Sequence, residues 1–299
     1  MKIDLQQPIG VIGLGLMGQA FIKRLDTERV PVVGFDINAQ RREEIGLERT
    51  SASMSDIANR CNTFLLCVFD TNQVREVVLG SDGLLAHSKA KDSKTFICTS
   101  TCDPVPLAEI ARECEQSGAH FLELPISGTS QQVANADSLG LMGGTDQLCE
   151  DLAPLLDIIC SRRQHVGVAG DASKAKLAIN LVLGLHRAAM AEGLNFAKSI
   201  GLDVAKLLPV LQNSAAASQV MKIKGPLMVK RSYDKPQSRV DQSLKDFSLI
   251  QKLGAQSSQH LPLTDVYVRL LENCLSHGEG QLDNAIIFEA LARNALQEG

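Results

Sequence analysis

The chain has 299 residues, a formal net charge of −4 and eight cysteines. This length is typical of about two domains, and the acidic balance argues against nucleic acid or an anionic membrane surface as a partner. No apolar stretch reaches the ~18 residues needed to span a bilayer, and no two cysteines have C-x-x-C spacing. The composition therefore predicts a cytoplasmic protein with reduced thiols, no metal site and no membrane segment.

The first half of the chain alternates short apolar segments, typical of buried strands, with segments of helical spacing. This alternation predicts a doubly wound, mostly parallel sheet in a Rossmann domain over residues 1–168. The expected strands are 9–14, 31–36, 63–69, 95–99, 119–124, 138–143 and 163–167. The expected helices are 17–25, 38–46, 53–60, 71–79, 104–117 and 145–158, with turns at 80–83 and 125–130.

The second half shows no convincing strand and predicts an all-helical domain over residues 169–299. Residues 173–200 contain no proline and predict one helix of ~28 residues, about 42 Å long at ~1.5 Å per residue, that joins the domains. Its apolar surface predicts a homodimer or homotetramer built on this helix and the C-terminal helices. Further helices are expected at 203–213, 241–254, 263–276 and 283–296, and a solvated basic loop at 222–239.

A G-x-G-x-x-G pattern follows the first predicted strand and opens the first predicted helix. Gly13 allows a tight turn, Gly15 lets the backbone approach a pyrophosphate, and Gly18 lets the helix pack close to the strand. The side chains between these glycines are expected to line the cofactor groove: Leu14, Leu16 and Met17. Asp36 ends the second predicted strand, about 20 residues after the glycine pattern, where a carboxylate can accept hydrogen bonds from a ribose.

Asp36 predicts NAD rather than NADP as the preferred cofactor. A 2′-phosphate would meet the like charge of this carboxylate, and Ile37 stands where NADP-binding proteins usually have an arginine. Arg41 and Arg42 lie a few residues later and leave the use of NADP possible.

Hydride transfer needs a side chain that accepts or donates a proton, and a candidate lysine lies on the long predicted helix. Neither tyrosine of the chain has a lysine four residues on, and the sequence holds no metal-ligand cluster. Lys176 and Asn180 are four residues apart and share a helical face, where the chain leaves the nucleotide-binding domain. On spacing alone, Lys176 is either a buried general acid and base or, like Lys174, an exposed helix residue.

Several blocks together make the sequence resemble the β-hydroxyacid dehydrogenases, such as 3-hydroxyisobutyrate dehydrogenase and tartronate semialdehyde reductase. The matching blocks are GLGLMG at 13–18, STCDP at 100–104, ELPISGTS at 123–130, GLMGG at 140–144, Lys-x-x-x-Asn at 176–180, AEGLNFAKSIGLD at 191–203, LKDF at 244–247 and GEGQLDNA at 278–285. They follow the family's order over nearly the whole chain. The resemblance implies an enzyme that moves a hydride between NAD(P) and a small hydroxy acid or its semialdehyde.

The resemblance also implies roles for individual residues. Lys176 matches the catalytic lysine, and Asn180 matches the asparagine that helps to hold the substrate. Thr101 matches a threonine that contacts the cofactor, and Lys245, supported by Asp246, matches a lysine that closes over cofactor and substrate. The loop that grips the substrate carboxylate is matched by Ser127, Gly128 and Thr129, the last of which replaces the family's second glycine.

Three other functions are considered: reduction of another polar aldehyde, reduction of an imine, and a non-catalytic role as an interaction module. Relatives reduce other polar aldehydes, such as a sulfonated or a C4 semialdehyde, with the same apparatus. Imine reductases of this kind generally lack a lysine at the position of Lys176, and relatives that are non-catalytic interaction modules have lost it. The lysine therefore favours a dehydrogenase, while the substrate and the physiological direction stay open.

Overall fold

The computed structural model describes residues 2–88 and 93–294. The chain forms two compact units, Met1–Lys176 and Leu177–Gly299. The expected boundary at residue 168 precedes the long helix, and the first turns of that helix belong to the first unit. Among the described residues, no helix is long and apolar enough to cross a membrane.

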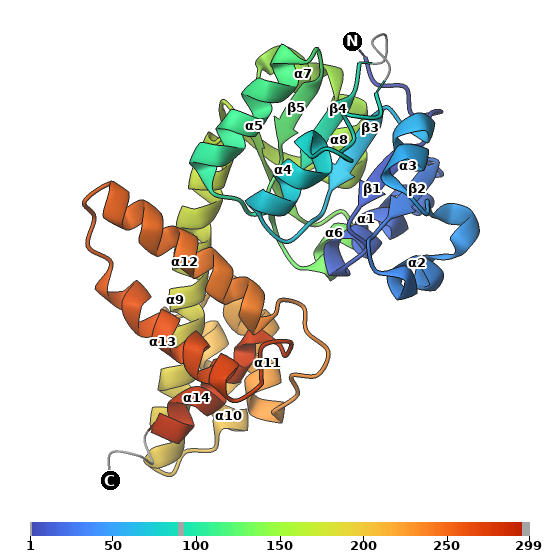
Figure 1. Ribbon diagram of the computed structural model, residues 1–299. Helices are drawn as coiled ribbons and strands as arrows, with labels where there is room; N and C mark the ends of the chain where they lie inside the picture. The colour runs from blue at the N-terminus through green and yellow to red at the C-terminus, as the bar shows by residue number, and fades with distance from the viewer. Residues whose placement is uncertain (1, 89–92, 295–299) are drawn as a thin grey trace. The chain divides into compact units, whose positions relative to one another are not determined.

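The first unit is built on one mixed, mainly parallel sheet (Figure 1). The strand order is β2-β1-β3-β4-β5-β7-β6, with β8 paired to β7. The strands are β1 (Ile9–Ile12), β2 (Val32–Phe35), β3 (Thr63–Leu66), β4 (Thr95–Cys98), β5 (His120–Glu123), β6 (Ile126–Ser127), β7 (Leu139–Gly143) and β8 (Arg162–Gly167). The first five are parallel neighbours, whereas β7 runs antiparallel to β5 and β6. The predicted Rossmann-like sheet is confirmed, with β6 as an added short strand.

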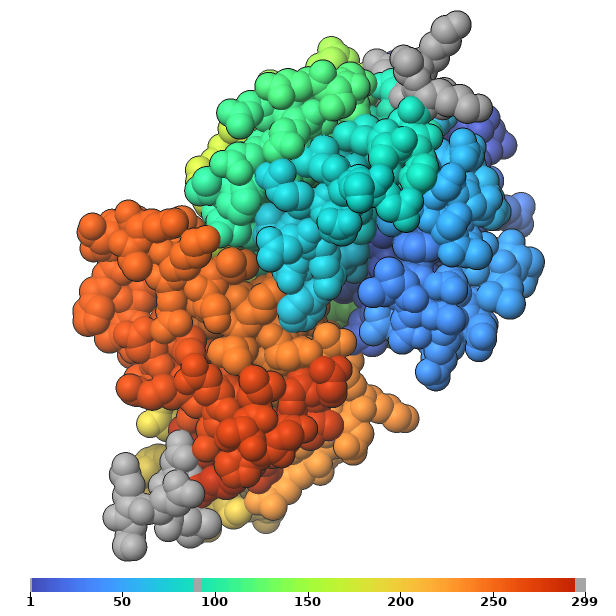
Figure 2. Space-filling view, viewed as in Figure 1, coloured from blue at the N-terminus to red at the C-terminus, as the bar shows by residue number. Residues whose placement is uncertain are grey.

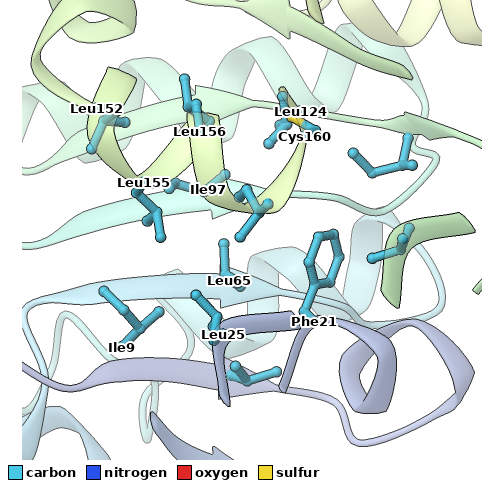
Figure 3. Close-up of a cluster of buried hydrophobic side chains, with 14 of the residues drawn as sticks. Ile9, Phe21, Leu25, Leu65, Ile97, Leu124, Leu152, Leu155, Leu156 and Cys160 are labelled. Atoms are coloured by element: carbon cyan, nitrogen blue, oxygen red, sulfur yellow. The ribbon is translucent and has the colours of Figure 1, made fainter. Parts of the chain in front are cut away.

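Apolar residues cover both faces of this sheet, which explains the nearly continuous apolar runs of the sequence. Leu65 and Ile97 lie in the core on one face, against helices α1 (Leu16–Thr27) and α8 (Ala153–Ile159) (Figure 3). Phe64 and Phe96 point to the opposite face, where their rings stack at 5.7 Å. Helices must therefore cover both sides, as they do in a doubly wound fold.

The helices of the first unit differ from the predicted ones at three places, one of which is the unexpected 3-10 helix η1 (Leu47–Arg49). They are α1 (Leu16–Thr27), α2 (Ala39–Ile45), η1 (Leu47–Arg49), α3 (Met54–Arg60), α4 (Thr71–Leu79), α5 (Pro104–Gln116), α6 (Ser130–Ala134), α7 (Asp146–Asp151) and α8 (Ala153–Ile159). The predicted helix at 145–158 is split, because Pro154 has no amide hydrogen to continue the ladder from α7. Helix α6 was not expected; its first residue, Ser130, lies in the predicted turn.

The second unit is all-helical, as predicted, with no strand among its described residues. Its helices are the greater part of α9 (Asp171–Ser199), then α10 (Val204–Asn213), α11 (Gln219–Lys230), α12 (Val240–Gln256), α13 (Pro262–Ser276), η2 (Asn284–Ile286) and α14 (Ile287–Asn294). Helices α12 and α13, coloured orange, form part of the surface of this unit (Figure 2). The long helix α9 has 29 residues, and the last two residues of the predicted helix 283–296 lie outside the described part.

The prediction of a solvated loop at 222–239 is wrong for its first part. Helix α11 includes Lys224, which is buried and forms an ion pair with Asp283 at 2.7 Å. Asp283 also accepts hydrogen bonds from the backbone of Gln237 and Ala285. The positive charge of Lys224, which indicated a solvated segment, is thus buried in an ion pair. Its partner, Asp283, lies 59 residues away in the sequence.

Candidate functional site

The glycine loop after β1 has the backbone shape that its pattern predicts. Gly13 has a φ of +93°, and a Cβ there would lie 2.6 Å from the carbonyl oxygen of Cys67. A Cβ on Gly18 would lie 1.9 Å from the carbonyl oxygen of Gly13. Only glycine fits at both places, so helix α1 starts directly on the turn.

The N-terminus of α1 faces open space at Gly15. Gly15 is the N-cap residue, and no side chain caps this helix end. A Cβ on Gly15 would come no closer than 3.9 Å to the described atoms, the nearest being Arg41 Nη1. Uncapped amides and the positive end of the helix dipole suit a phosphate group. The loop therefore fits the pyrophosphate of a dinucleotide.

The residues between the glycines lie in different surroundings. Leu14 is fully buried in the core, so its side chain cannot contact a cofactor. Met17 is half-buried and packs at the edge of the same core, while Leu16 is exposed. The side chains of Leu16 and Met17 can therefore line a cofactor groove, as expected, whereas the side chain of Leu14 cannot.

Asp36 lies beside the glycine loop, and its carboxylate already has three partners. Oδ2 accepts a hydrogen bond from Leu14 N–H at 2.8 Å and lies 3.3 Å from Arg41 Nη1. Oδ1 accepts from Asn38 N–H at 2.8 Å, and Arg42 donates to the main-chain carbonyl of Asp36. Asp36 is only 5% exposed, whereas the Arg41 side chain is 42% exposed. The carboxylate is therefore held in place next to a cation that reaches solvent.

The segment STCDP follows β4 at the same carboxyl edge of the sheet. Ser100 Oγ donates to the carbonyl oxygen of Val68 at 2.7 Å, and Asp103 N–H donates to Thr71 Oγ1 at 2.8 Å. These bonds hold the segment against the end of β3 and the start of α4. Thr101 lies between the two anchored residues and is half-buried.

The segment ELPISGTS forms β6 and the start of α6. Ser127 pairs with Leu139 of β7 and is half-buried, while Gly128 is exposed. Thr129 caps α6: its Oγ1 accepts from Gln132 N–H at 3.3 Å, and its own N–H donates to Gln132 Oε1 at 2.9 Å. The amide proton of Thr129 is thus already used, so Ser127 and Gly128 are better placed than Thr129 to contact a ligand.

The structure shows that Lys176 is not an exposed residue of the long helix. Lys176 is 7% exposed, whereas the Lys174 side chain is 57% exposed and pairs with Asp171 at 2.9 Å. Lysine is rarely buried so deeply in a protein. Lys176 is therefore the buried lysine of α9, and Lys174 is the ordinary surface residue.

Asn180 and Lys245 meet at Asp246 in the second unit. Asn180 Nδ2 donates to Asp246 Oδ2 at 2.8 Å, and Lys245 Nζ lies 3.0 Å from Asp246 Oδ1. Helix α12 approaches α9 closely here because residue 184 is glycine; a Cβ at Gly184 would lie 2.3 Å from the ring of Phe247. The sequence predicted Asp246 only as a support for Lys245. Its bond to Asn180, 66 residues away, is a finding of the structure.

The cysteines offer no reactive thiol in the described residues. The Sγ atoms of Cys98 and Cys102 lie 4.0 Å apart, and both residues are fully buried. The hydrogen bond between Cys98 and Cys102, together with burial, holds the pKa of Cys98 well above its ordinary value, and burial raises the pKa of Cys67 to about 12. All eight cysteines are free thiols, and no described group of three His, Cys, Asp or Glu could hold a metal ion.

Two family models together match most of the chain. The model of the NAD binding domain of 6-phosphogluconate dehydrogenase matches residues 8–168. The model described as the NAD-binding domain of NADP-dependent 3-hydroxyisobutyrate dehydrogenase matches residues 170–291.

Individual relatives match along nearly their full length. The chain is 27% identical to the 2-hydroxy-3-oxopropionate reductase of Escherichia coli (strain K12), over 95% of this chain and 96% of that protein. It is also 27% identical to glyoxylate/succinic semialdehyde reductase 1 of Arabidopsis thaliana, over 95% of this chain and 98% of that protein. A 3-hydroxyisobutyrate dehydrogenase structure from Salmonella typhimurium has the same fold, with a TM-score of 0.85, 23% identity, and coverage of 95% of this chain and 99% of that one.

Proposed function

We propose that this chain, which belongs to the β-hydroxyacid dehydrogenase family of NAD(P)-dependent enzymes, interconverts a small hydroxy acid and its semialdehyde with NAD as the preferred cofactor. The observation that carries the proposal is the burial of Lys176 in the second turn of α9, while Lys174 beside it is exposed. A lysine this deeply buried is expected where its amine takes part in chemistry.

The residues of the first unit fit a dinucleotide. The amides at the start of α1 suit the pyrophosphate, since Gly15 leaves that end of the helix open. Asp36 suits the ribose that follows, and Thr101 lies at the same sheet edge, toward which the nicotinamide end would extend. When bound, the nicotinamide supplies or accepts the hydride.

Lys176 moves the proton that accompanies the hydride. In the oxidation, its amine accepts the proton of the substrate hydroxyl; in the reduction, its ammonium group returns a proton to the carbonyl oxygen. Asn180 lies one helical turn further along the same face and orients the substrate. Because Asn180 Nδ2 donates to Asp246, its amide oxygen faces away from that carboxylate and can accept a hydrogen bond from a hydroxyl.

The carboxylate of the substrate is assigned to Ser127 and Gly128. A serine hydroxyl and a main-chain N–H group both donate hydrogen bonds, and donors of this kind recognise an anion. The amide of Thr129 already bonds Gln132 and its hydroxyl oxygen accepts from Gln132 N–H, so the only donor that Thr129 can offer the substrate is its hydroxyl hydrogen. The named relatives are reductases of oxo acids, which supports a substrate that carries both a carboxylate and a carbonyl or hydroxyl group.

The proposal is tested with a panel of substrates and one variant. Purified protein is assayed for NADH formation with C3–C5 hydroxy acids, including 3-hydroxyisobutyrate, glycerate, threonate and 4-hydroxybutyrate, and for NADH consumption with the matching aldehydes. A sulfonated aldehyde and a cyclic imine test the alternative substrates. Turnover of a carboxylate-bearing substrate that is lost in Lys176→Ala supports the proposal; turnover of the imine alone, or none in the panel, contradicts it.

A further inference from the structure

We propose that Glu123 is a positioning residue that fixes Lys176 through the first turn of α9, an inference that rests on the proposed role of Lys176. Glu123 ends strand β5, and its side chain is fully buried. Its Oε2 accepts hydrogen bonds from the N–H groups of Gly170 at 2.8 Å and Ala172 at 3.2 Å. A carboxylate of the sheet thus caps the helix that carries Lys176.

The cap lies on the helix face of Lys176. Ala172 and Ser173 precede Lys176 by four and three residues, spacings that place residues on one face a turn apart. Lys176 lies only six residues beyond Gly170, or about 9 Å along the axis at ~1.5 Å per residue. A tilt or shift of the capped turn therefore moves Lys176 with it.

The charge of Glu123 makes this cap specific. Burial raises the pKa of Glu123, and hydrogen bonding from Ser173, Gly170 and Ala172 opposes that effect. The Ser173 hydroxyl is close enough to favour the charged form, although neither its Oγ nor Glu123 Oε1 completes a well-formed hydrogen bond. The positive end of the helix dipole also favours an anion here. The hydrogen bonds and the helix dipole offset the cost of burying the carboxylate only when the start of α9 lies where it does. The carboxylate therefore holds the helix end in that position.

Neighbouring backbone leaves the cap little room to move. A Cβ on Gly143, which pairs with Glu123 across the sheet, would lie 2.7 Å from Glu123 Oε2 and 3.2 Å from Ala172 Cβ. Gly170 has a φ of +98°, and a Cβ there would lie 2.9 Å from the carbonyl oxygen of Pro104. Strand β7 and helix α5 therefore enclose the contact between Glu123 and the start of α9.

The test compares Glu123→Gln with Asp171→Asn. Glu123→Gln keeps the shape of the side chain and removes its charge. Asp171→Asn removes a carboxylate from the first residue of the same helix, where it is partly exposed and pairs with Lys174. We expect Glu123→Gln to lower kcat by about 10- to 100-fold, since a displacement of ~1 Å can cost that much, and to leave KM for NAD within about twofold. Asp171→Asn should change kcat by less than about twofold.

A double-mutant cycle with Lys176→Ala separates positioning from general stability. If Glu123 acts through Lys176, adding Glu123→Gln to Lys176→Ala should lower kcat by less than about twofold, because the group to be positioned is gone. Hydrogen exchange at the amides of Gly170 and Ala172, whose hydrogen bonds Glu123 accepts, should be faster in Glu123→Gln and unchanged in Asp171→Asn, whose carboxylate instead accepts from Val168 N–H. Equal losses of kcat in both backgrounds, or a normal kcat in Glu123→Gln, would overturn the proposal.

A second variant and a separate readout allow the test to fail clearly. If Glu123→Gln does not fold, Glu123→Asp keeps the charge but shortens the side chain by about 1.5 Å, and the same cycle applies. Failure of the proposed function is recognised separately, because wild-type protein would then turn over no substrate or Lys176→Ala would keep normal turnover. In that case the exchange data alone decide whether Glu123 fixes the start of α9.

Discussion

Replacing Arg41 with alanine should strengthen the preference for NAD over NADP. In the structure, Arg41 Nη1 lies 3.3 Å from Asp36 Oδ2 and is the described atom nearest the open side of Gly15. The Arg41 side chain is 42% exposed, so its ion pair with Asp36 contributes only about 0.2–1 kcal/mol and can exchange for another anion. Arg41 is thus the cation that a 2′-phosphate of NADP would meet.

The size of the effect follows from the bond that NADP would lose. A hydrogen bond between an arginine and a phosphate contributes about 1.5–3 kcal/mol, and NAD has no phosphate at that position. Since about 1.4 kcal/mol corresponds to tenfold, the ratio of kcat/KM for NAD to that for NADP should rise by about 10- to 100-fold in Arg41→Ala. In the wild type, the repulsion from Asp36 predicts a preference for NAD of about ten- to a hundredfold.

The assay measures kcat/KM for both cofactors with one active substrate in the wild type, Arg41→Ala and Arg49→Ala. Arg49 is a matched control, because it is an exposed arginine of the same unit that pairs with Asp26. An unchanged ratio in Arg41→Ala, or an equal change in Arg49→Ala, would refute the reasoning. Asp36→Ala should narrow the preference for NAD; no narrowing would show that Asp36 is not the ribose ligand.

Four further outcomes are expected. Lys176→Ala should lower kcat by at least ~100-fold with little change in KM for NAD, and steady-state kinetics that give near-normal turnover would exclude Lys176 as the proton-transfer group. Asp246→Ala should raise KM for the substrate about tenfold in steady-state assays, because Asn180 loses the acceptor that orients it; an unchanged KM would contradict this role. Lys224→Met should lower the free energy of unfolding in urea by about 3–5 kcal/mol, since it leaves a buried carboxylate unpaired, whereas Lys174→Met should cost less than about 1 kcal/mol. Light scattering at micromolar concentration should give at least a dimer, because exposed apolar side chains such as Phe196 and Val182 line α9; a monomer mass would contradict this assembly.

Local rules of backbone geometry made much of the fold readable from the sequence. Gly13 and Gly18 stand where any Cβ would collide with the backbone, so the pattern itself dictates the turn and the start of α1. Buried parallel strands need continuous apolar runs, and these appear in the sequence at nearly the observed bounds. Helix α6 could also have been predicted from the sequence, because Thr129 and Gln132 have the spacing of a capping box. The helix is too short to show helical periodicity.

Burial and long-range pairing were decided only by the tertiary structure. Lys174 and Lys176 are chemically identical and two residues apart, so their different exposure depends on what packs against each helix face rather than on any local property. Glu123 and Gly170, like Asn180 and Asp246, are brought together by elements far apart in sequence. Periodicity shows which residues share a face, but the partner across that face is set by the packing of the whole unit. For this reason the sequence could name Lys176 as a candidate, while the structure alone showed that Glu123 caps the start of α9 and that Asp246 bonds Asn180.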